Sequence, residues 1–380
     1  MRARTGWGVG LAVLGVLCLV AAGVLAWVVV PSKKQLPADT DTVRQFDGTA
    51  KVLLNPQALA SNDLKSAILN NVPVTAKREV KVTATDGSAA QVSDDRVLQA
   101  SGQPIGQSNA AYAVDRTSLE ATTDHPSDWQ VAQHEGLTVS WPIGSQQQDY
   151  TGWVNETQTT TPIKYVRQED HGGVSTYVYT ASVPATPIKD KQVLSALPPA
   201  IPQGTLGSLA AALPLPAEVK AGLAQALPQL SNPVPLSYTY ESTSTYWVEP
   251  TTGIVIDTER EDIRKAGIGG PGGKVLAAVP VYDVTTKFTS QSVADAASDA
   301  NDATSTINTY GKTLPWILGI VGLLALIAGL VLALTGRGRG GTPAVATSYP
   351  GSRPSGTSGP PQGTVPPGTA PPQTPPTDAV

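Results

Sequence analysis

The chain contains very few of the residues that carry covalent, redox or metal chemistry. Among its 380 residues there is one cysteine, Cys18, and there are three histidines, His125, His134 and His171. A single cysteine excludes an intrachain disulfide and a cysteine-based zinc site. Cys18 lies in an apolar run directly after Leu17, which is too bulky for a lipoprotein modification site. We therefore interpret Cys18 as an apolar filler and expect the fold to be stabilised by burial alone.

The chain also lacks a recognisable catalytic or cofactor motif. No two histidines stand four residues apart, as in a zinc-protease helix, and no Gly-x-Ser-x-Gly nucleophile turn occurs. Gly267–Gly272 matches a dinucleotide-binding fingerprint in its letters. That motif needs a strand before it and a helix after it, and because neither flank fits we expect a loop. A carboxylate pair for glycosidase chemistry stays open, since scattered Asp and Glu residues have no diagnostic spacing. Otherwise the sequence predicts no catalytic residue, cofactor, metal ligand or enzyme activity.

Two long apolar runs lie near the ends of the chain, Trp7–Val30 and Leu314–Leu334, and neither contains a charged residue. An α-helix needs about 20 consecutive apolar residues to cross a bilayer. Residues 7–30 and 314–334 are therefore predicted to be transmembrane helices, with the lipid bilayer as their partner. Gly15 and Gly319 lie near the middle of the runs and favour close helix packing. Neither run has the polar residues that mark an ion path.

Positive charge flanks both runs on the side of the chain ends. Two arginines lie within residues 1–6, and two more open residues 335–380. Such residues are preferentially kept on the cytoplasmic side of a membrane. We therefore expect a multi-pass cell-membrane protein with both termini in the cytoplasm and residues 31–313 outside it.

A cleavable signal peptide is the alternative interpretation of the first run. Val24-Leu25-Ala26 has the small-residue spacing that a signal peptidase accepts. The run is longer than the 7–15 apolar residues of a usual signal core, so a retained helix is the prediction that we carry forward.

The segment between the runs, residues 31–313, reads mainly as β-strands. It carries 21 Lys and Arg against 29 Asp and Glu, a net charge of −8, which disfavours a nucleic-acid partner. Segments rich in β-branched residues are separated by Gly, Pro, Asn or Asp. The expected strands in the first part are Phe46–Leu54, Val74–Thr85, Ala89–Gln99 and Ala111–Glu120.

Two hairpins are predicted from turn chemistry. The first joins Leu236–Val248 to Ile254–Glu261, with Pro250 fixing φ at a turn position and Gly253 supplying a positive φ. The second joins Ile163–Gln168 to Gly173–Val183 through the four intervening residues.

The period changes to a helical one over about residues 190–230. Leucines recur with alanine at helical spacing, and prolines divide the stretch, so we expect two or three short amphipathic helices. The apolar residues singled out as ligand-binding candidates are Leu209, Leu213 and Leu223. Ser292–Tyr310 is predicted as a further helix that leads into the second apolar run.

Residues 340–380 consist mainly of Pro, Gly, Thr and Ser. Such a segment cannot bury enough apolar surface to fold, so it is predicted to be a disordered cytoplasmic tail. Its proline doublets favour a polyproline II helix, which fits an aromatic-lined groove on a cytoplasmic partner protein. A solvated tail without a specific partner is the alternative.

An ordered series of motifs in residues 7–335 resembles an actinobacterial membrane-protein family, labelled porin PorA-like. The most specific of them is Tyr246–Asp257, the predicted hairpin. The others are Trp141–Gly144, Tyr150–Trp153, Ile163–Val166 and Gly173–Tyr179. The resemblance implies an architecture with two anchors. It does not imply a lipid-embedded strand barrel, because such a barrel needs lipid-facing alternation along many strands and aromatic girdles.

The expected fold is an α+β membrane protein. Its antiparallel β-rich extracytoplasmic domain carries a small helical insert and is flanked by two transmembrane helices. The expected function is non-enzymatic: the outer domain binds or transfers an apolar or lipid ligand. The alternative is an envelope scaffold or signalling protein that recruits partners through its Pro-rich tail.

Overall fold

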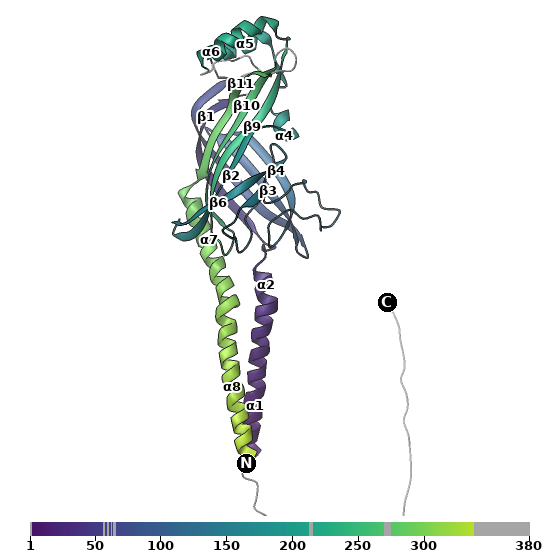
Figure 1. Ribbon diagram of the computed structural model, residues 1–380, viewed down its shortest axis with the longest axis vertical. Coiled ribbons are helices and arrows are strands. Elements are labelled where there is room, and N and C mark those ends of the chain that lie inside the picture. Colours follow the sequence, from purple (N-terminus) through teal and green to yellow (C-terminus); the bar gives the residue numbers. More distant parts are fainter. Residues whose placement is uncertain are drawn as a thin grey trace, which may run out of the picture.

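The computed structural model describes residues 2–55, 58, 61, 63, 66–212, 216–269 and 275–337. In this part of the chain a β-rich head stands on a pair of long helices, with short helices at the far end of the head (Figure 1). The strands are β1 (Asp41–Leu54), β2 (Ile68–Asp86), β3 (Ala89–Ala100), β4 (Gln103–Asp115), β5 (Tyr150–Val154), β6 (Thr159–His171), β7 (Val174–Pro187), β8 (Ala200–Ile201), β9 (Val234–Val248), β10 (Val255–Gly269) and β11 (Val275–Phe288). The α-helices are α1 (Arg2–Val24), α2 (Val30–Lys33), α4 (Lys191–Ser195), α5 (Gln203–Ala212), α6 (Ala217–Ala226), α7 (Ser290–Asn308) and α8 (Leu314–Arg337).

The strands form one curled antiparallel sheet, a half-barrel. Its order is β4-β3-β2-β1-β11-β10-β9-β7-β6-β5, with β8 pairing to β9 off this path. The first strand pairs with the last, since Phe46 lies opposite Phe288. The chain is therefore an α+β protein with an antiparallel sheet and two apolar helices, as predicted.

Trp141 is central to the largest core cluster, which lies inside the curl. Its ring contacts those of Tyr179 and Tyr246, at centroid distances of 6.0 and 4.6 Å. Along β9 the alternation is regular: Tyr238 and Tyr240 are buried on the inner face, whereas Thr243 is exposed on the outer face. This alternation separates an enclosed face from a polar outer one.

The predicted turn at Gly253 is confirmed. Gly253 has a φ of +73°, and its N–H donates to the carbonyl of Glu249 at 2.9 Å. A Cβ at this position would lie 2.3 Å from the carbonyl oxygen of Trp141, so glycine is required for space as well as for φ.

Several expected strand boundaries were wrong. β1, β2 and β4 begin earlier than expected, at residues 41, 68 and 103, and β7 and β10 extend further, to residues 187 and 269. Residues 169–171 belong to β6, because the turn is made by Gly172 and Gly173 alone, with φ of +61° and +79°. β4 also ends earlier than expected, at Asp115 and not at Glu120. The Asp115 carboxylate accepts hydrogen bonds from the N–H groups of Thr117 and Ser118, at 2.9 and 2.8 Å, and turns the chain out of the strand.

The long helices α1 and α8 pack side by side in opposite directions. A Cβ at Gly15 would lie 2.6 Å from the backbone nitrogen of Leu326, and one at Gly8 would lie 2.8 Å from that of Ala333. Glycine thus permits the close approach. Gly319 has no atom within 4 Å of such a Cβ, so the expectation that it packs at this contact was wrong and Gly322 does so instead.

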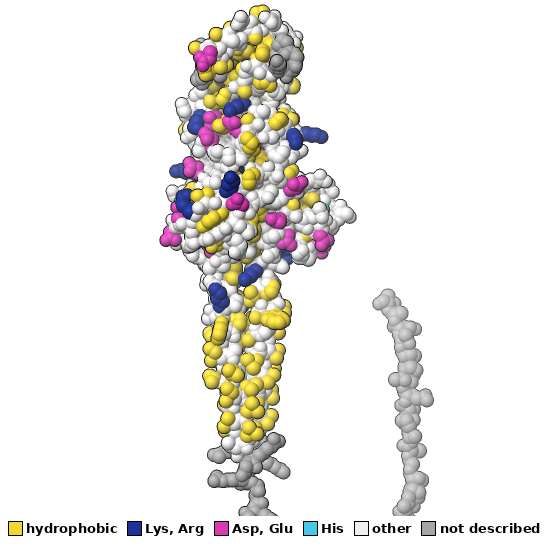
Figure 2. Space-filling view, viewed as in Figure 1, with side chains coloured by type: hydrophobic (Ala, Val, Ile, Leu, Met, Phe, Trp, Pro, Cys, Tyr) yellow, Lys and Arg dark blue, Asp and Glu magenta, His cyan; other side chains and the backbone are white. Residues whose placement is uncertain are grey.

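Two helical stretches are long and apolar enough to cross a membrane, Gly6–Val29 and Ser290–Thr335. The second includes α7, which continues into α8 through a π-helical turn, Thr309–Thr313. This confirms the prediction that a polar helix leads into the second apolar run. Ala296 and Ala300 of α7 are buried against Ile256 of β10, so the head and the helix pair share a packed junction. Figure 2 shows apolar side chains concentrated on the helix pair and charged ones on the head.

Several expectations fall on residues outside the described part. They concern the tail, residues 340–380, together with Leu213 and residues 270–272 of the glycine-rich segment. Gly267–Gly269 belongs to β10, so the start of that segment is a strand and not the expected loop.

Candidate functional site

The helical insert covers the end of the head that is farthest from α1 and α8 (Figure 1). Leu209 and Leu223 are only 6% and 4% exposed and belong to one core cluster with Ile201, Ile268 and Val279. We call α5 and α6 the cap. The structure thus brings two of the three candidate residues together beneath the cap.

A small cavity of about 50 Å³ lies between the cap and the sheet. Its lining is apolar and includes Leu206, Leu209, Leu223 and Ile268, with the ring of Tyr238. The Tyr238 hydroxyl donates to the Pro198 carbonyl at 2.7 Å, and burial raises the pKa of this hydroxyl to about 12. The space admits only one or two water-sized groups, so an acyl chain requires the cap to move.

The inner face of the sheet carries a charged cluster around Asp94. Its side chain is 3% exposed and accepts hydrogen bonds from Arg78 at 2.8 Å and from Arg96 at 2.7 Å. Burial by itself would raise the pKa of the Asp94 carboxyl, but the two guanidinium charges outweigh it and hold this pKa well below its usual range.

A second charged group lies on the inner face of β10. Arg260 Nε donates to Asp262 at 2.8 Å, and the hydroxyl of Tyr240 bonds to the same carboxylate. Arg264 lies 4.6 Å above the ring of Tyr282. Sequence reasoning missed the group around Asp94. It interpreted the charged residues of 259–265 as a solvated, self-paired strand end, whereas the structure pairs Arg260 with Asp262 but partly buries both. The available signal was charge at alternate strand positions, in register with buried aromatic residues.

His171 belongs to a cluster of side chains from three strands. Its Nε2 lies 2.9 Å from Asp257, and its ring stacks on Trp247 at 4.6 Å. The Trp247 indole N–H donates to Glu169 at 2.6 Å, so the cluster ties β6 to β9 and β10. Within the described residues, no group of three His, Cys, Asp or Glu could hold a metal ion.

A curled antiparallel sheet with charge inside it, carried on a close pair of apolar helices, defines an α+β protein with a distinct apolar stalk. The porin PorA family model matches residues 7–331. The chain belongs to this family, and the resemblance seen in the sequence is confirmed.

Two relatives bear the name of this family, and each is matched over almost all of its own length. A protein named porin PorA from Corynebacterium resistens is 25% identical, over 86% of this chain and 96% of its own. Another of that name, from Corynebacterium amycolatum, is 23% identical, over 85% of this chain and 97% of its own.

The likeness to solved structures is weak. An acyl-CoA thioesterase II from Mycobacterium marinum is 12% identical, over 65% of this chain and 80% of its own, with a TM-score of 0.12. A hot dog fold protein from Alicyclobacillus acidocaldarius has the same identity and TM-score, over 70% and 84% of the two chains. Scores this low carry no argument about fold or activity.

Proposed function

We propose that the protein is a non-enzymatic component of the cell envelope, anchored in the cell membrane by α1 and α8. The observation that carries the proposal is the exposure of large apolar side chains along both helices. Trp7 of α1 is 75% exposed and Leu324 of α8 is 62% exposed. A helix pair in water would leave an apolar surface far larger than soluble proteins tolerate. A bilayer would cover it, with both chain ends in the cytoplasm and the head outside.

Labelling of single cysteines tests this topology. In a Cys18→Ala background, Ser88→Cys puts a thiol on the exposed β2–β3 turn of the head. Ser355→Cys puts one in the tail. A membrane-impermeant maleimide should label the first in cells with an intact cytoplasmic membrane and the second only after lysis. The reverse pattern would mean that the topology is inverted. Labelling of both thiols in cells with an intact cytoplasmic membrane would contradict the two-span anchor.

For the activity, we propose that passage of solutes, as the name of the family suggests, takes place through an assembly of copies. The described strands of a single copy do not make a lipid-embedded barrel, because the outer face of their sheet carries groups such as Lys51, Glu259 and Glu261. Its two helices contain no polar path of their own. Several copies together would enclose a polar path between their heads and helices.

Conductance in planar bilayers tests the channel. The purified protein should give discrete current steps whose frequency rises more steeply than the first power of protein concentration. A linear dependence would indicate a pore made by one copy and would contradict the assembly. No current at any protein density would contradict channel activity itself.

The second candidate function is binding of an apolar or lipid ligand beneath the cap, which the apolar lining of its small cavity supports. Ala210 lines this cavity, whereas Ala221 is exposed on α6. Ala210→Leu should fill the cavity and abolish uptake of a fluorescent fatty acid, and Ala221→Leu should not. Equal uptake by both variants, or none by the parent protein, would contradict this role.

Recruitment of a cytoplasmic partner by residues 340–380 stays a prediction. If the protein is a scaffold, a strain in which only the tail is deleted should behave like a strain that lacks the whole protein. A deletion strain that behaves like the parent would contradict the scaffold function and leave the activity with the head and helices.

A further inference from the structure

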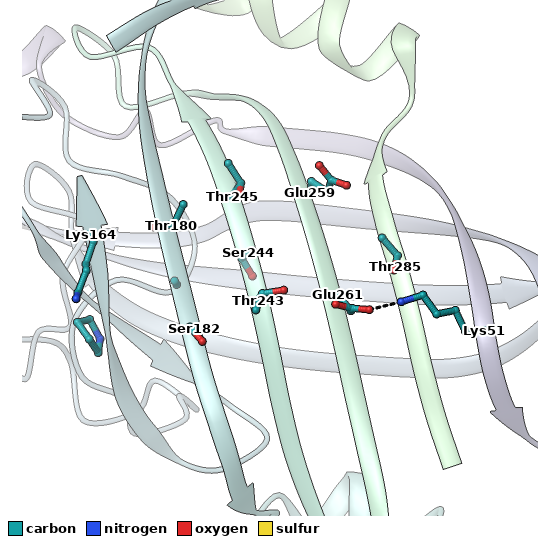
Figure 3. Close-up of a pocket in the computed structure, with 12 residues that line it drawn as sticks. Lys51, Lys164, Thr180, Ser182, Thr243, Ser244, Thr245, Glu259, Glu261 and Thr285 are labelled. Carbon is teal, nitrogen blue, oxygen red and sulfur yellow. Dashed lines mark hydrogen bonds and ion pairs between the residues drawn. The ribbon is translucent and has the colours of Figure 1, made fainter. Parts of the chain in front are cut away.

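A broad hollow of about 650 Å³ lies on the outer face of the sheet, separate from the cap and from the helix pair. We call it the trough. It crosses six strands, from β1 through β11, β10, β9 and β7 to β6 (Figure 3). Its volume is within the range of about 300–1,000 Å³ that is typical of ligand sites.

The trough is lined by short polar side chains in two rows across the strands. In one row Thr180 lies opposite Thr245, and Thr245 opposite Glu259. In the other row, Ser182, Thr243, Glu261 and Thr285 follow one another on β7, β9, β10 and β11. Because strands are about 4.8 Å apart, each row offers one polar group at every such interval.

Most of these groups have free hydrogen-bonding capacity. Within the described part of the chain, no hydrogen bond joins the side-chain hydroxyls of Thr180, Thr243 or Thr245 to another protein group. Lys51 pairs with Glu261, but Glu259 and Lys164 have no ion-pair partner among the described residues. A bound molecule would therefore meet donors and acceptors that do not have to break protein contacts.

The charge of the trough narrows the class of ligand. Its lining has two lysines, Lys51 and Lys164, and two glutamates, Glu259 and Glu261, so the charges balance. A polyanion or a polycation gains nothing from a neutral surface. Charged and hydroxyl side chains recur along the whole lining, so an acyl chain would have to bury them without hydrogen-bond partners, which disfavours such a ligand. Extended peptides bind through the backbone of an edge strand, whereas every strand across the middle of this trough is paired on both sides.

We propose that the trough binds a neutral glycan chain laid across the strands. A sugar chain offers many hydroxyl groups, no charge and a repeat close to the distance between neighbouring strands. Each sugar unit would meet the polar side chains of about one strand, with Thr243 and Thr245 at the centre. The protein would thus attach to an envelope polysaccharide through the outer face of its head.

The test is binding of free oligosaccharides to the full-length protein. The protein is purified in a detergent without a sugar headgroup, since such headgroups would compete. Titration calorimetry and an array of neutral and anionic glycans measure binding. The variant Thr243→Val/Thr245→Val removes two hydroxyls but keeps β-branched side chains that suit a strand. The control, Thr75→Val/Thr160→Val, changes two exposed strand threonines outside the trough.

We expect neutral oligosaccharides to bind the parent protein and the control alike. The affinity of the trough variant should fall by at least about tenfold, and its melting temperature should be unchanged. Equal loss in both variants, or none in either, would overturn the site. Binding only of anionic glycans, of extended peptides or of a neutral glycolipid in vesicles would overturn the ligand class. No binding across the array would overturn the proposal.

Discussion

At the scale of single residues, the inner face of the sheet depends on charges that satisfy one another. Asp94 is nearly inaccessible to water, and both of its partners are arginines on neighbouring strand positions. A buried carboxylate of this kind is stable only while its partners remain charged and bonded. The adjacent Asp95 is exposed on the opposite face, so the two residues form a natural pair for comparison.

Asp94→Asn should destabilise the head by about 3 kcal/mol, because two arginines lose their shared counter-charge. Asp95→Asn should change stability by less than about 0.5 kcal/mol. Thermal melting of the full-length variants in detergent, followed by tryptophan fluorescence, measures both. Similar melting of the two variants would mean that the Asp94 cluster contributes little.

The turn at Gly253 gives a second prediction. Gly253→Val requires a β-branched residue at a φ of +73° and brings its Cβ within 2.6 Å of the Pro142 carbonyl oxygen. The backbone conformation alone costs about 1–3 kcal/mol. Thr251→Val should be nearly neutral, because no side-chain hydrogen bond of Thr251 is found among the described residues. Equal melting of the two variants would show that the turn does not need glycine.

At the scale of elements, close contact between α1 and α8 makes a directly measurable prediction. A Cβ at Gly322 would lie 3.0 Å from the Cβ of Cys18 and 2.9 Å from the carbonyl oxygen of Gly15, whereas one at Gly319 would have no atom within 4 Å. Disulfides need Cβ atoms about 3.8 Å apart, so the small separation of the helices that relieves the contact with Gly15 also brings this pair to disulfide geometry. Gly322→Cys should therefore form a disulfide with Cys18 under mild oxidation, and Gly319→Cys should not. Loss of maleimide-reactive thiols measures this, and equal reactivity of the two variants would contradict the pairing.

The cap is the other element with a clear test. Leu209→Asp and Leu223→Asp should unfold the cap and destabilise the head, because each places a carboxylate in an apolar cluster. If these leucines serve only a ligand, melting should be nearly unchanged and binding of a fluorescent fatty acid should be lost. Unchanged melting together with unchanged binding would contradict both roles.

At the scale of the whole molecule, the head should lose stability in acid. Burial would raise the pKa of Asp115, but hydrogen bonds from Ser118 and Thr117 lower it, and the pKa of Asp94 is lowered as well. A carboxyl with a depressed pKa stabilises the fold above its unfolded value of about 3.9 and loses that contribution as the pH falls through the folded value.

Burial lowers the pKa of His134, so melting temperature should begin to fall below about pH 6.5, where the unfolded chain takes up a proton that the folded chain resists. It should fall more steeply below about pH 4, where the carboxyls lose their contribution. The difference between the parent protein and Asp94→Asn should shrink over the same acidic range. A difference that persists unchanged at low pH would show that the contribution of Asp94 is not ionic.

The sequence by itself determined the parts of this protein that depend on neighbours along the chain. Apolar runs without charge predicted the long helices, proline and glycine predicted the turn before Ile254, and alternation predicted most strands. Each of these signals is a local preference of the backbone or a period of burial. Family membership also followed from motifs that can be read in order along the chain.

Only the tertiary structure decided how these elements meet. It paired the first strand with the last, joined Arg44 to Asp299 at 2.6 Å and brought Asp94 between two arginines. It also aligned the threonines and charges of six strands into the trough. The reason is physical: strand order and sheet curl are set by the global burial of one face, and the spacing of residues along the chain does not encode which distant strand satisfies a given charge.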